Sequence, residues 1–221
     1  MPRTAPDTDD CAAARPQQRL SADARRAELI EATLATIADE GLHAATLRRV
    51  AERAGVSNGL IRHHFSGKQQ MILAAYAEVI DRMTLPGRAA LARRDLAPIP
   101  RLAGFIRASL DPGVTEPRLF SIWAAFVALV HLDPEFESAH RAGYLDYQAG
   151  FEPLLRAALT EAGHLADLPN VPKLVMQINA LIDGLWVEGS LLGPDFAEGT
   201  LIELALDGAG RILNIELERL S

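Results

Sequence analysis

The stretch TLRRVAERAGVSNGLIRHHFSGK, residues 46–68, constrains the fold of this chain more than any other segment. Thr46 is a suitable helix N-cap, and apolar residues recur after it at the three- and four-residue spacing of a short helix. Gly55 can adopt the left-handed backbone of a tight turn, and Ser57 is a second N-cap, which opens a helix predicted to extend to about His64. Two short helices joined in this way form a helix-turn-helix, the unit that many proteins use to read DNA.

The second of these helices carries the residue types that such a unit needs at its tip. In a helix-turn-helix the second helix enters the major groove, while the first crosses the phosphate backbone. Ser57, Asn58 and Gly59 are predicted to lie at the tip, followed one turn later by Arg62 and His63. Because Gly59 has no side chain, the backbone there can approach a phosphate or a base closely.

A third helix is predicted to begin at Lys68, with Ser66 and Gln69 as a capping box. A cation in the first turn of a helix opposes the helix dipole, and a bound phosphate would compensate for it. Lys68 is therefore predicted to bind the DNA backbone. A helix pair used only for packing is the alternative interpretation of the whole segment.

The helix-turn-helix and the long helix predicted before it resemble the DNA-binding domain of the tetracycline-repressor (TetR) family of bacterial regulators. The shared residues are Thr46, Val50, Ala51, the AGVS turn from Ala54 to Ser57, Gly59, His64, Phe65 and Lys68. The family usually has tyrosine where this chain has Arg62, which can bind a phosphate or a guanine. The resemblance implies DNA contacts by Thr46, Arg48, Ser57, Asn58, Gly59, Arg62, His63, His64 and Lys68.

Two later segments, 119–133 and 180–192, resemble the regulatory domain of the BetI-type subgroup, repressors of choline-to-betaine genes and their relatives. The shared features are the W-x-A-F run from Trp123 to Phe126, the boundary from His131 to Pro134, the LIDGLW run from Leu181 to Trp186 and the VSNG run from Val56 to Gly59. This resemblance implies a dimeric repressor that a small-molecule effector releases from double-stranded operator DNA.

The candidate effector-binding residues are mainly aromatic. They are Trp123, Phe126, Tyr144, Tyr147, Asp183 and Trp186. Aromatic faces with a carboxylate suit a quaternary ammonium or polyamine cation, such as a choline-like molecule. An apolar or amphipathic effector fits a similar set. Core packing is the alternative role for each aromatic residue, and a hydrogen bond at a dimer seam is the alternative for Asp183.

Composition favours an all-α protein and places the acidic charge away from the helix-turn-helix. Apolar residues make up 49% of the chain, alternating β-branched runs are almost absent, and the formal net charge is −7. Residues 1–68 carry 10 basic and 9 acidic side chains, whereas residues 69–221 carry 12 and 20. The negative net charge therefore does not exclude a nucleic-acid partner, because local arginines and lysines bind the phosphates.

We expect a disordered tail over residues 1–20, a helix-turn-helix domain over 21–67 and a helical effector-binding and dimerisation domain over 68–221. The single cysteine, Cys11, lies in the tail, so no disulfide framework exists and the cytoplasm is the expected compartment. No apolar run approaches the roughly 20 residues of a membrane span, so no membrane partner is expected.

Later helices are predicted from periodicity and from proline and glycine boundaries. The first is expected from Lys68 to about Met83, with a hinge at Pro86-Gly87; the others are expected near 99–110, 117–131, 134–162, 172–192 and 196–219. The last two are broadly apolar, and Gly184, Gly189 and Ser190 offer room for another helix. A twofold homodimer through these two helices would place two reading helices roughly 34 Å apart. Interior packing of both helices is the alternative.

Enzyme motifs are missing from the chain. There is no G-x-S-x-G motif, no phosphate-binding glycine loop and no dinucleotide fingerprint. The six histidines show no repeated metal-ligand spacing, so we expect no metal, no cofactor and no enzymatic activity. The competing class is a helical protein-interaction adaptor without specific DNA binding, which would lack the salt-dependent DNA affinity of a regulator.

Overall fold

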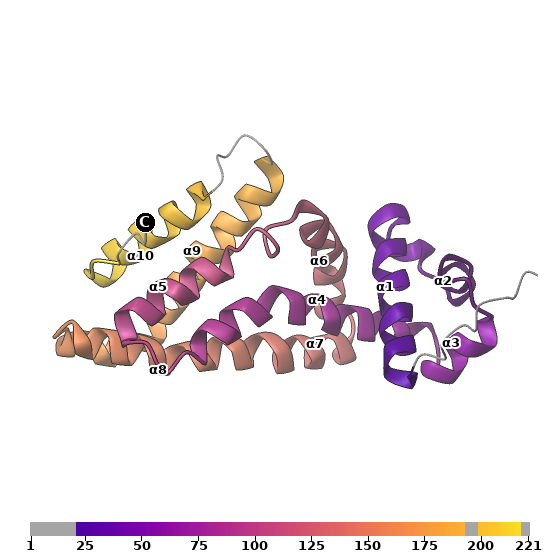
Figure 1. Cartoon of the computed structure of the whole chain (residues 1–221), viewed down its shortest axis with the longest axis horizontal. Coiled ribbons are helices and arrows are strands. Elements are labelled where there is room, and N and C mark those ends of the chain that lie inside the picture. The colour runs from indigo at the N-terminus through magenta and orange to yellow at the C-terminus, as the bar shows by residue number, and fades with distance from the viewer. Residues whose placement is uncertain (1–20, 193–198, 218–221) are drawn as a thin grey trace, which may run out of the picture.

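The computed structural model describes residues 21–192 and 199–217, and this part of the chain is helical without any strand (Figure 1). The all-α prediction is confirmed. The helices are α1 (Ala22–Glu40), α2 (Leu47–Ala54), α3 (Asn58–His64), α4 (Lys68–Leu91), α5 (Pro98–Ser109), α6 (Pro117–Val130), α7 (Pro134–His140), α8 (Asp146–Glu161), α9 (Val171–Leu192) and α10 (Thr200–Leu213). Short 3-10 segments are η1 (Leu42–Ala44) and η3 (Leu165–Asn170), and a π-helical turn, η2, spans Arg141–Leu145.

Two apolar cores hold these helices together. One joins α1, α2, α3 and the first half of α4 to α6 and α7; the other joins α5, α8, α9 and α10. Figure 1 shows α2 and α3 at one end of the molecule, α10 toward the other, and α4 leading from the helix-turn-helix into the body. Met83 of α4 and Trp123 of α6 pack against both cores. These two helices therefore connect the ends of the molecule.

Helix α4 is longer than predicted. It continues through Pro86 to Leu91, so the predicted hinge at Pro86-Gly87 is wrong. Proline removes one backbone hydrogen bond, but tertiary packing retains the helix. Gly87 lies under the ring of Tyr147 from α8, where an added Cβ would be 2.6 Å from the Tyr147 hydroxyl oxygen. Gly87 therefore allows α8 to pack closely against α4, and it does not end the helix.

The helix predicted over 134–162 is interrupted. The π-helical turn η2 separates α7 from α8, where Gly143 lies against Ile80 of α4. Insertions of this kind disturb the regular hydrogen-bond ladder and leave no clear signal in apolar spacing. The turn therefore escaped the sequence-based prediction.

Helix α10 is shorter than predicted and differs at its end. It finishes at Leu213 because Asn214 adopts the left-handed conformation (φ 51°), and the amide of Ile215 then donates to the carbonyl of Gly210. On the neighbouring helix α9, Gly189 is in contact with Leu201 of α10, and Ser190 is buried. Of the three small residues expected to receive a second helix, only Gly184 faces open space.

The tail over 1–20, with Cys11, lies outside the described residues. Among the described helices, none combines the length and the apolar character needed to cross a membrane.

Candidate nucleic-acid interface and effector site

The helix-turn-helix forms as its sequence predicts. The Thr46 hydroxyl accepts a hydrogen bond from the Arg49 amide at 3.2 Å, and the Ser57 hydroxyl accepts from the Leu60 amide at 3.3 Å. Between them Gly55 is left-handed, with φ 65°. Val50 and Ile61 are fully buried, one on each helix, and so hold α2 against α3. The two predicted caps and the turn are confirmed.

The predicted DNA-contact residues form an exposed face at this end of the molecule. Thr46, Arg48, Ser57, Asn58, Gly59, Arg62, His63 and Lys68 are exposed, and His64 is half-buried. Neither Arg62 nor Lys68 forms an ion pair with any carboxylate of the described chain, and Arg48 has only a 3.7 Å contact to Glu52. These cations are therefore available to phosphates.

Two other arginines of α2 have a different role. Arg49 Nε lies 2.8 Å from Glu40 Oε2, and Arg53 lies 2.6 Å from Asp39 and 2.8 Å from Glu40. The hydrogen bonds that Arg49 and Arg53 donate to Glu40 lower the pKa of this carboxyl to about 2. Both arginines therefore tie α2 to the end of α1, a role that was not predicted from the sequence. The missed signal was the adjacent acidic pair that ends α1.

The start of α4 corrects the predicted capping box. The N-cap is Gly67 without any side-chain hydrogen bond, so Ser66 does not cap the helix. The Gln69 amide instead donates to Asp133 and to Glu135, both at 3.1 Å. Gln69 thus ties α4 to α7, because two carboxylates at the start of α7 accept its hydrogen bonds in place of a local cap.

The structure divides the six candidate effector residues into three groups. Trp123 and Trp186 meet edge to face with ring centroids 5.0 Å apart, and Phe120 completes this cluster. Trp186 is 4% exposed, and its indole Nε1 donates to the carbonyl of Val114 at 2.8 Å. Phe126 is fully buried, and its ring neighbours are Tyr76 and Phe136 rather than the other candidates.

The third group centres on Asp183. The hydroxyl of Tyr144 donates to Asp183 Oδ2 at 2.6 Å, and Tyr147 lies beside Tyr144 with ring centroids 6.4 Å apart. Desolvation raises the pKa of the Asp183 carboxyl, although the Tyr144 hydrogen bond opposes this shift. Desolvation and the nearby Asp183 charge raise the pKa of Tyr144, so its hydroxyl remains a donor. A cation would stabilise this partly desolvated carboxylate.

Two residues that were not predicted from the sequence, Tyr76 and His140, link this group to α4. Tyr76 Oη and His140 Nδ1 share a hydrogen bond of 2.8 Å, and the His140 ring stacks on Tyr144 at 5.2 Å between centroids. Desolvation lowers the pKa of His140, which favours its neutral form. His140 immediately precedes the π-helical turn, so no regular periodicity indicated its partner.

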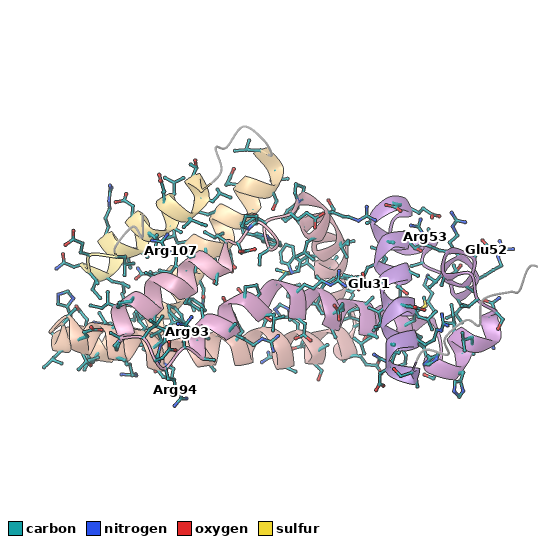
Figure 2. All side chains as sticks on the ribbon, viewed as in Figure 1. Glu31, Glu52, Arg53, Arg93, Arg94 and Arg107 are labelled. Atoms are coloured by element: carbon teal, nitrogen blue, oxygen red, sulfur yellow. The ribbon has the colours of Figure 1, made fainter. Side chains whose placement is uncertain are left out.

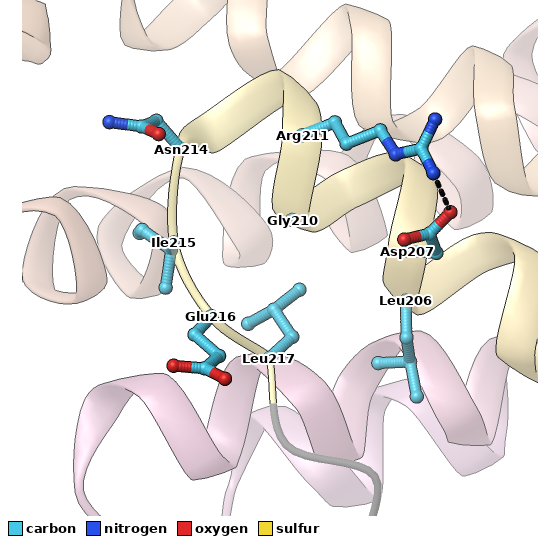
Figure 3. A pocket seen from close by; sticks show the side chains of 8 residues that line it. All are labelled: Leu206, Asp207, Gly210, Arg211, Asn214, Ile215, Glu216 and Leu217. Carbon is cyan, nitrogen blue, oxygen red and sulfur yellow. Dashed lines mark ion pairs between the residues drawn. The ribbon is translucent and has the colours of Figure 1, made fainter.

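A separate groove of about 770 Å³ lies at the end of α10 (Figure 3). Its lining residues are Leu206, Asp207, Gly210, Arg211, Asn214, Ile215, Glu216 and Leu217. Arg211 forms an ion pair of 2.8 Å with Asp207 on its rim. None of the predicted effector residues lines this groove. Across the described residues, no group of histidine, cysteine or acidic side chains is arranged to hold a metal ion.

Two family models match the chain. Residues 29–75 match the model of bacterial regulatory proteins of the tetR family, and residues 98–214 match the C-terminal model of BetI-type transcriptional repressors. The HTH-type transcriptional regulator BetI of Pectobacterium carotovorum is 31% identical over 184 residues, covering 83% of this chain and 91% of that protein. BetI of Paraburkholderia phymatum is also 31% identical, covering 84% and 91%.

Solved structures agree with this assignment. A putative transcriptional regulator from Pseudomonas aeruginosa PAO1 has a TM-score of 0.79 and 32% identity, covering 89% of this chain and 93% of its own. A putative transcriptional regulator from Saccharomonospora viridis, solved in complex with choline, shares the fold with a TM-score of 0.65 and 19% identity, covering 89% and 100%. These relatives are DNA-binding regulators and not enzymes. The chain belongs to the TetR family of transcriptional regulators, with a regulatory region of the BetI type.

Proposed function

We propose that this regulator acts in the bacterial cytoplasm as a dimeric repressor, which a small cationic effector releases from its operator. The observation that carries the effector class is the 2.6 Å hydrogen bond between Tyr144 and Asp183 among aromatic rings. A carboxylate supplies the counter-charge for a cation, and aromatic faces attract cations that cannot donate hydrogen bonds. The choline complex of the Saccharomonospora viridis protein supports a quaternary ammonium compound.

The route from effector to DNA in this proposal runs through α4. Asp183 contacts Tyr144, Tyr144 stacks on His140, and His140 shares a hydrogen bond with Tyr76 of α4. Lys68 begins the same helix. An effector that displaces Tyr144 would shift α4 and change the separation of the two reading helices, which is a coupling between two distinct sites.

The proposed dimer uses the outward faces of α9 and α10. Met176 is 73% exposed, Leu191 66% and Leu204 46%, although all three are large and apolar. Gly184 lies between Met176 and Leu191 on α9 and faces open space, so a partner helix can approach closely there. Exposed apolar patches of this kind mark protein contacts. A twofold contact would present both reading helices to one operator.

The decisive experiment is operator selection from genomic DNA with the purified protein, followed by titration of the complex with choline. We expect enrichment of a palindromic sequence and release of the DNA by choline, with tetramethylammonium as a second cation and sodium acetate as an anionic control. Asp183→Asn should abolish release without loss of operator binding. Failure to enrich any sequence at low salt would favour the helical adaptor, whereas release by neutral apolar compounds alone would overturn the cationic effector.

A further inference from the structure

One carboxylate joins the regulatory region to the helix-turn-helix. Arg118, in the first turn of α6, places Nη2 3.0 Å from Asp39 Oδ1 near the end of α1. The other oxygen of Asp39 accepts a hydrogen bond from Arg53 of α2 at 2.6 Å. Figure 2 shows Glu31 on α1 and Arg53 on the helix-turn-helix beyond it. Three helices from two parts of the chain therefore meet at Asp39.

The charges continue past Asp39 into α2. Arg53 also donates a hydrogen bond to Glu40 at 2.8 Å. Glu40 accepts a second hydrogen bond from Arg49, which lies on α2 like Arg53. The hydrogen bond from Arg53, and secondarily the charge of Arg118, lower the pKa of Asp39. All members therefore remain ionised at neutral pH. The position of α2 depends on the side chains that hold these two acids.

Helix α6 also carries two rings of the aromatic cluster formed by Phe120, Trp123 and Trp186. Trp123 lies five residues beyond Arg118 in α6 and packs against Trp186 of α9. The carbonyl of Val114, just before α6, accepts the hydrogen bond of the Trp186 indole. A helix of 14 residues moves as a rigid rod over about 21 Å. A displacement at Trp123 would accordingly reach Arg118.

Apolar packing between α1 and α6 is incomplete at this junction. A groove of about 440 Å³ separates Leu34 of α1 from Leu85 of α4 and Ile122 of α6. Leu85, on the groove wall, is 63% exposed. An ion pair lies toward each end of the α1 wall: Arg82 with Glu31, and Arg118 with Asp39. Close packing of side chains normally fixes the angle between two helices. Because that packing is incomplete at the groove, the two ion pairs contribute more to the angle between α1 and α6.

We propose that Arg118 is a positioning residue, which sets the orientation of the helix-turn-helix by holding Asp39 and thereby Arg53. Motion of α6 reaches the reading helix through this contact, independently of α4. The orienting role requires only the ion pair. Its use in effector response rests on the proposed function.

The test measures orientation directly, by single-molecule energy transfer in the full-length chain. Fluorophores are attached at His43→Cys in η1 and Ala149→Cys in α8, both exposed, with Cys11→Ser as the background. Labelled protein is diluted into excess unlabelled protein, so each assembly carries one labelled chain. Arg118→Gln is compared with Arg93→Gln, a matched control whose exposed arginine pairs only with the nearby Asp95.

We expect a broader distance distribution for Arg118→Gln and for Asp39→Asn, and a wild-type distribution for Arg93→Gln and for the charge-conserving Arg118→Lys. High salt should broaden the wild type in the same way, since it screens exposed pairs. Operator affinity of Arg118→Gln should fall about two- to fivefold, the range of one exposed ion pair. An unchanged distribution for Arg118→Gln, or equal broadening in Arg93→Gln, would overturn the proposal. If the proposed function were wrong, the operator selection would enrich no sequence. The distance distributions would still test the ion pair, because they are measured without DNA.

Discussion

At the scale of single residues, partners decide what an arginine of the helix-turn-helix can do. Arg49 and Arg53 neutralise Glu40 and Asp39, whereas Arg62 and Lys68 have no such counter-charge in the described chain. An arginine held by two carboxylates loses much of its attraction for phosphate, because DNA must first displace a charge-assisted pair. The sequence shows five cations between residues 46 and 68, and only the side-chain geometry separates Arg49 and Arg53 from the others.

His63 and Lys68 should affect DNA binding in different ways. We expect His63→Ala to change sequence preference, because His63 lies at a position that can reach base edges. Lys68→Ala should weaken all sequences nearly alike and reduce the slope of affinity against salt by about one counterion. Competition binding with a randomised operator library at two salt concentrations measures both effects. Equal losses for both variants on every sequence would remove this division of roles.

Asp183→Asn should stabilise the protein while removing the proposed response to cations. Because desolvation raises the pKa of Asp183 in the fold, its charged form is disfavoured, and stability is lost as pH rises through that pKa. Removing the charge should therefore raise the unfolding temperature at pH 7, and raise it less at acidic pH. Thermal scans between pH 4 and pH 8 check this. Destabilisation at pH 7 would mean that the carboxylate is needed for packing.

At the scale of elements, contacts between helices override local preferences. The proline in α4 is tolerated since α5 and α8 pack along the helix beyond it, and the π-helical turn lies where Gly143 meets Ile80. Gly87 and its contact Tyr147 lie 60 positions apart in the sequence, and Gly143 and Ile80 lie 63 apart. Periodicity detects which face of a helix is apolar, but it does not detect which partner covers that face.

Gly87→Ala should destabilise the fold although alanine favours helices. The new Cβ would meet Tyr147 at 2.6 Å, and the cost of overpacking, about 1–3 kcal/mol, should exceed the gain of about 1 kcal/mol in helix propensity. Gly104→Ala in α5 is the control, because a Cβ there meets nothing within 4 Å. Denaturant unfolding should give opposite signs for the two variants. The same sign in both would discount the Tyr147 contact.

The attachment of α2 to α1 should weaken in acid. Arg49 and Arg53 depress the pKa of Glu40 from 4.5 to about 2, so its contribution to stability is complete above pH 4.5 and is lost as pH falls toward 2. Glu40→Gln should lower the unfolding temperature at neutral pH, and its difference from the wild type should close over that range. A constant difference from pH 7 to pH 2 would refute this role of the Glu40 charge.

At the scale of the whole molecule, α4 and α6 connect two cores that are otherwise distinct. Each helix carries a residue packed against both cores, and each reaches α1 through an ion pair. Helices α2 and α3 lie at one end of the molecule and α10 lies toward the other (Figure 1), so in the proposed mechanism the helices between them would carry the movement. This arrangement suits a regulator whose dimer spacing controls DNA affinity.

Charged substitutions on the proposed dimer face should disrupt both assembly and operator binding. Leu204→Glu and Leu191→Glu should each raise the dimer dissociation constant more than tenfold, because burial of one leucine contributes about 1.5–3 kcal/mol. Leu132→Glu, at a 78% exposed site outside α9 and α10, is the control. Sedimentation velocity measures assembly. A monomeric wild type, or dimers unaffected by either change, would move the interface elsewhere.

Local sequence signals were enough to predict the helix-turn-helix, its two caps, its turn and the all-helical class. Thr46, Gly55 and Ser57 act on residues three or four positions away, so their effects are local and readable in order. Long-range packing, in contrast, determines that α4 continues through Pro86, that Tyr144 meets Asp183 and that Arg118 holds Asp39. Arg118 and Asp39 lie 79 positions apart. Their contact depends on how the two cores pack, which local spacing does not encode.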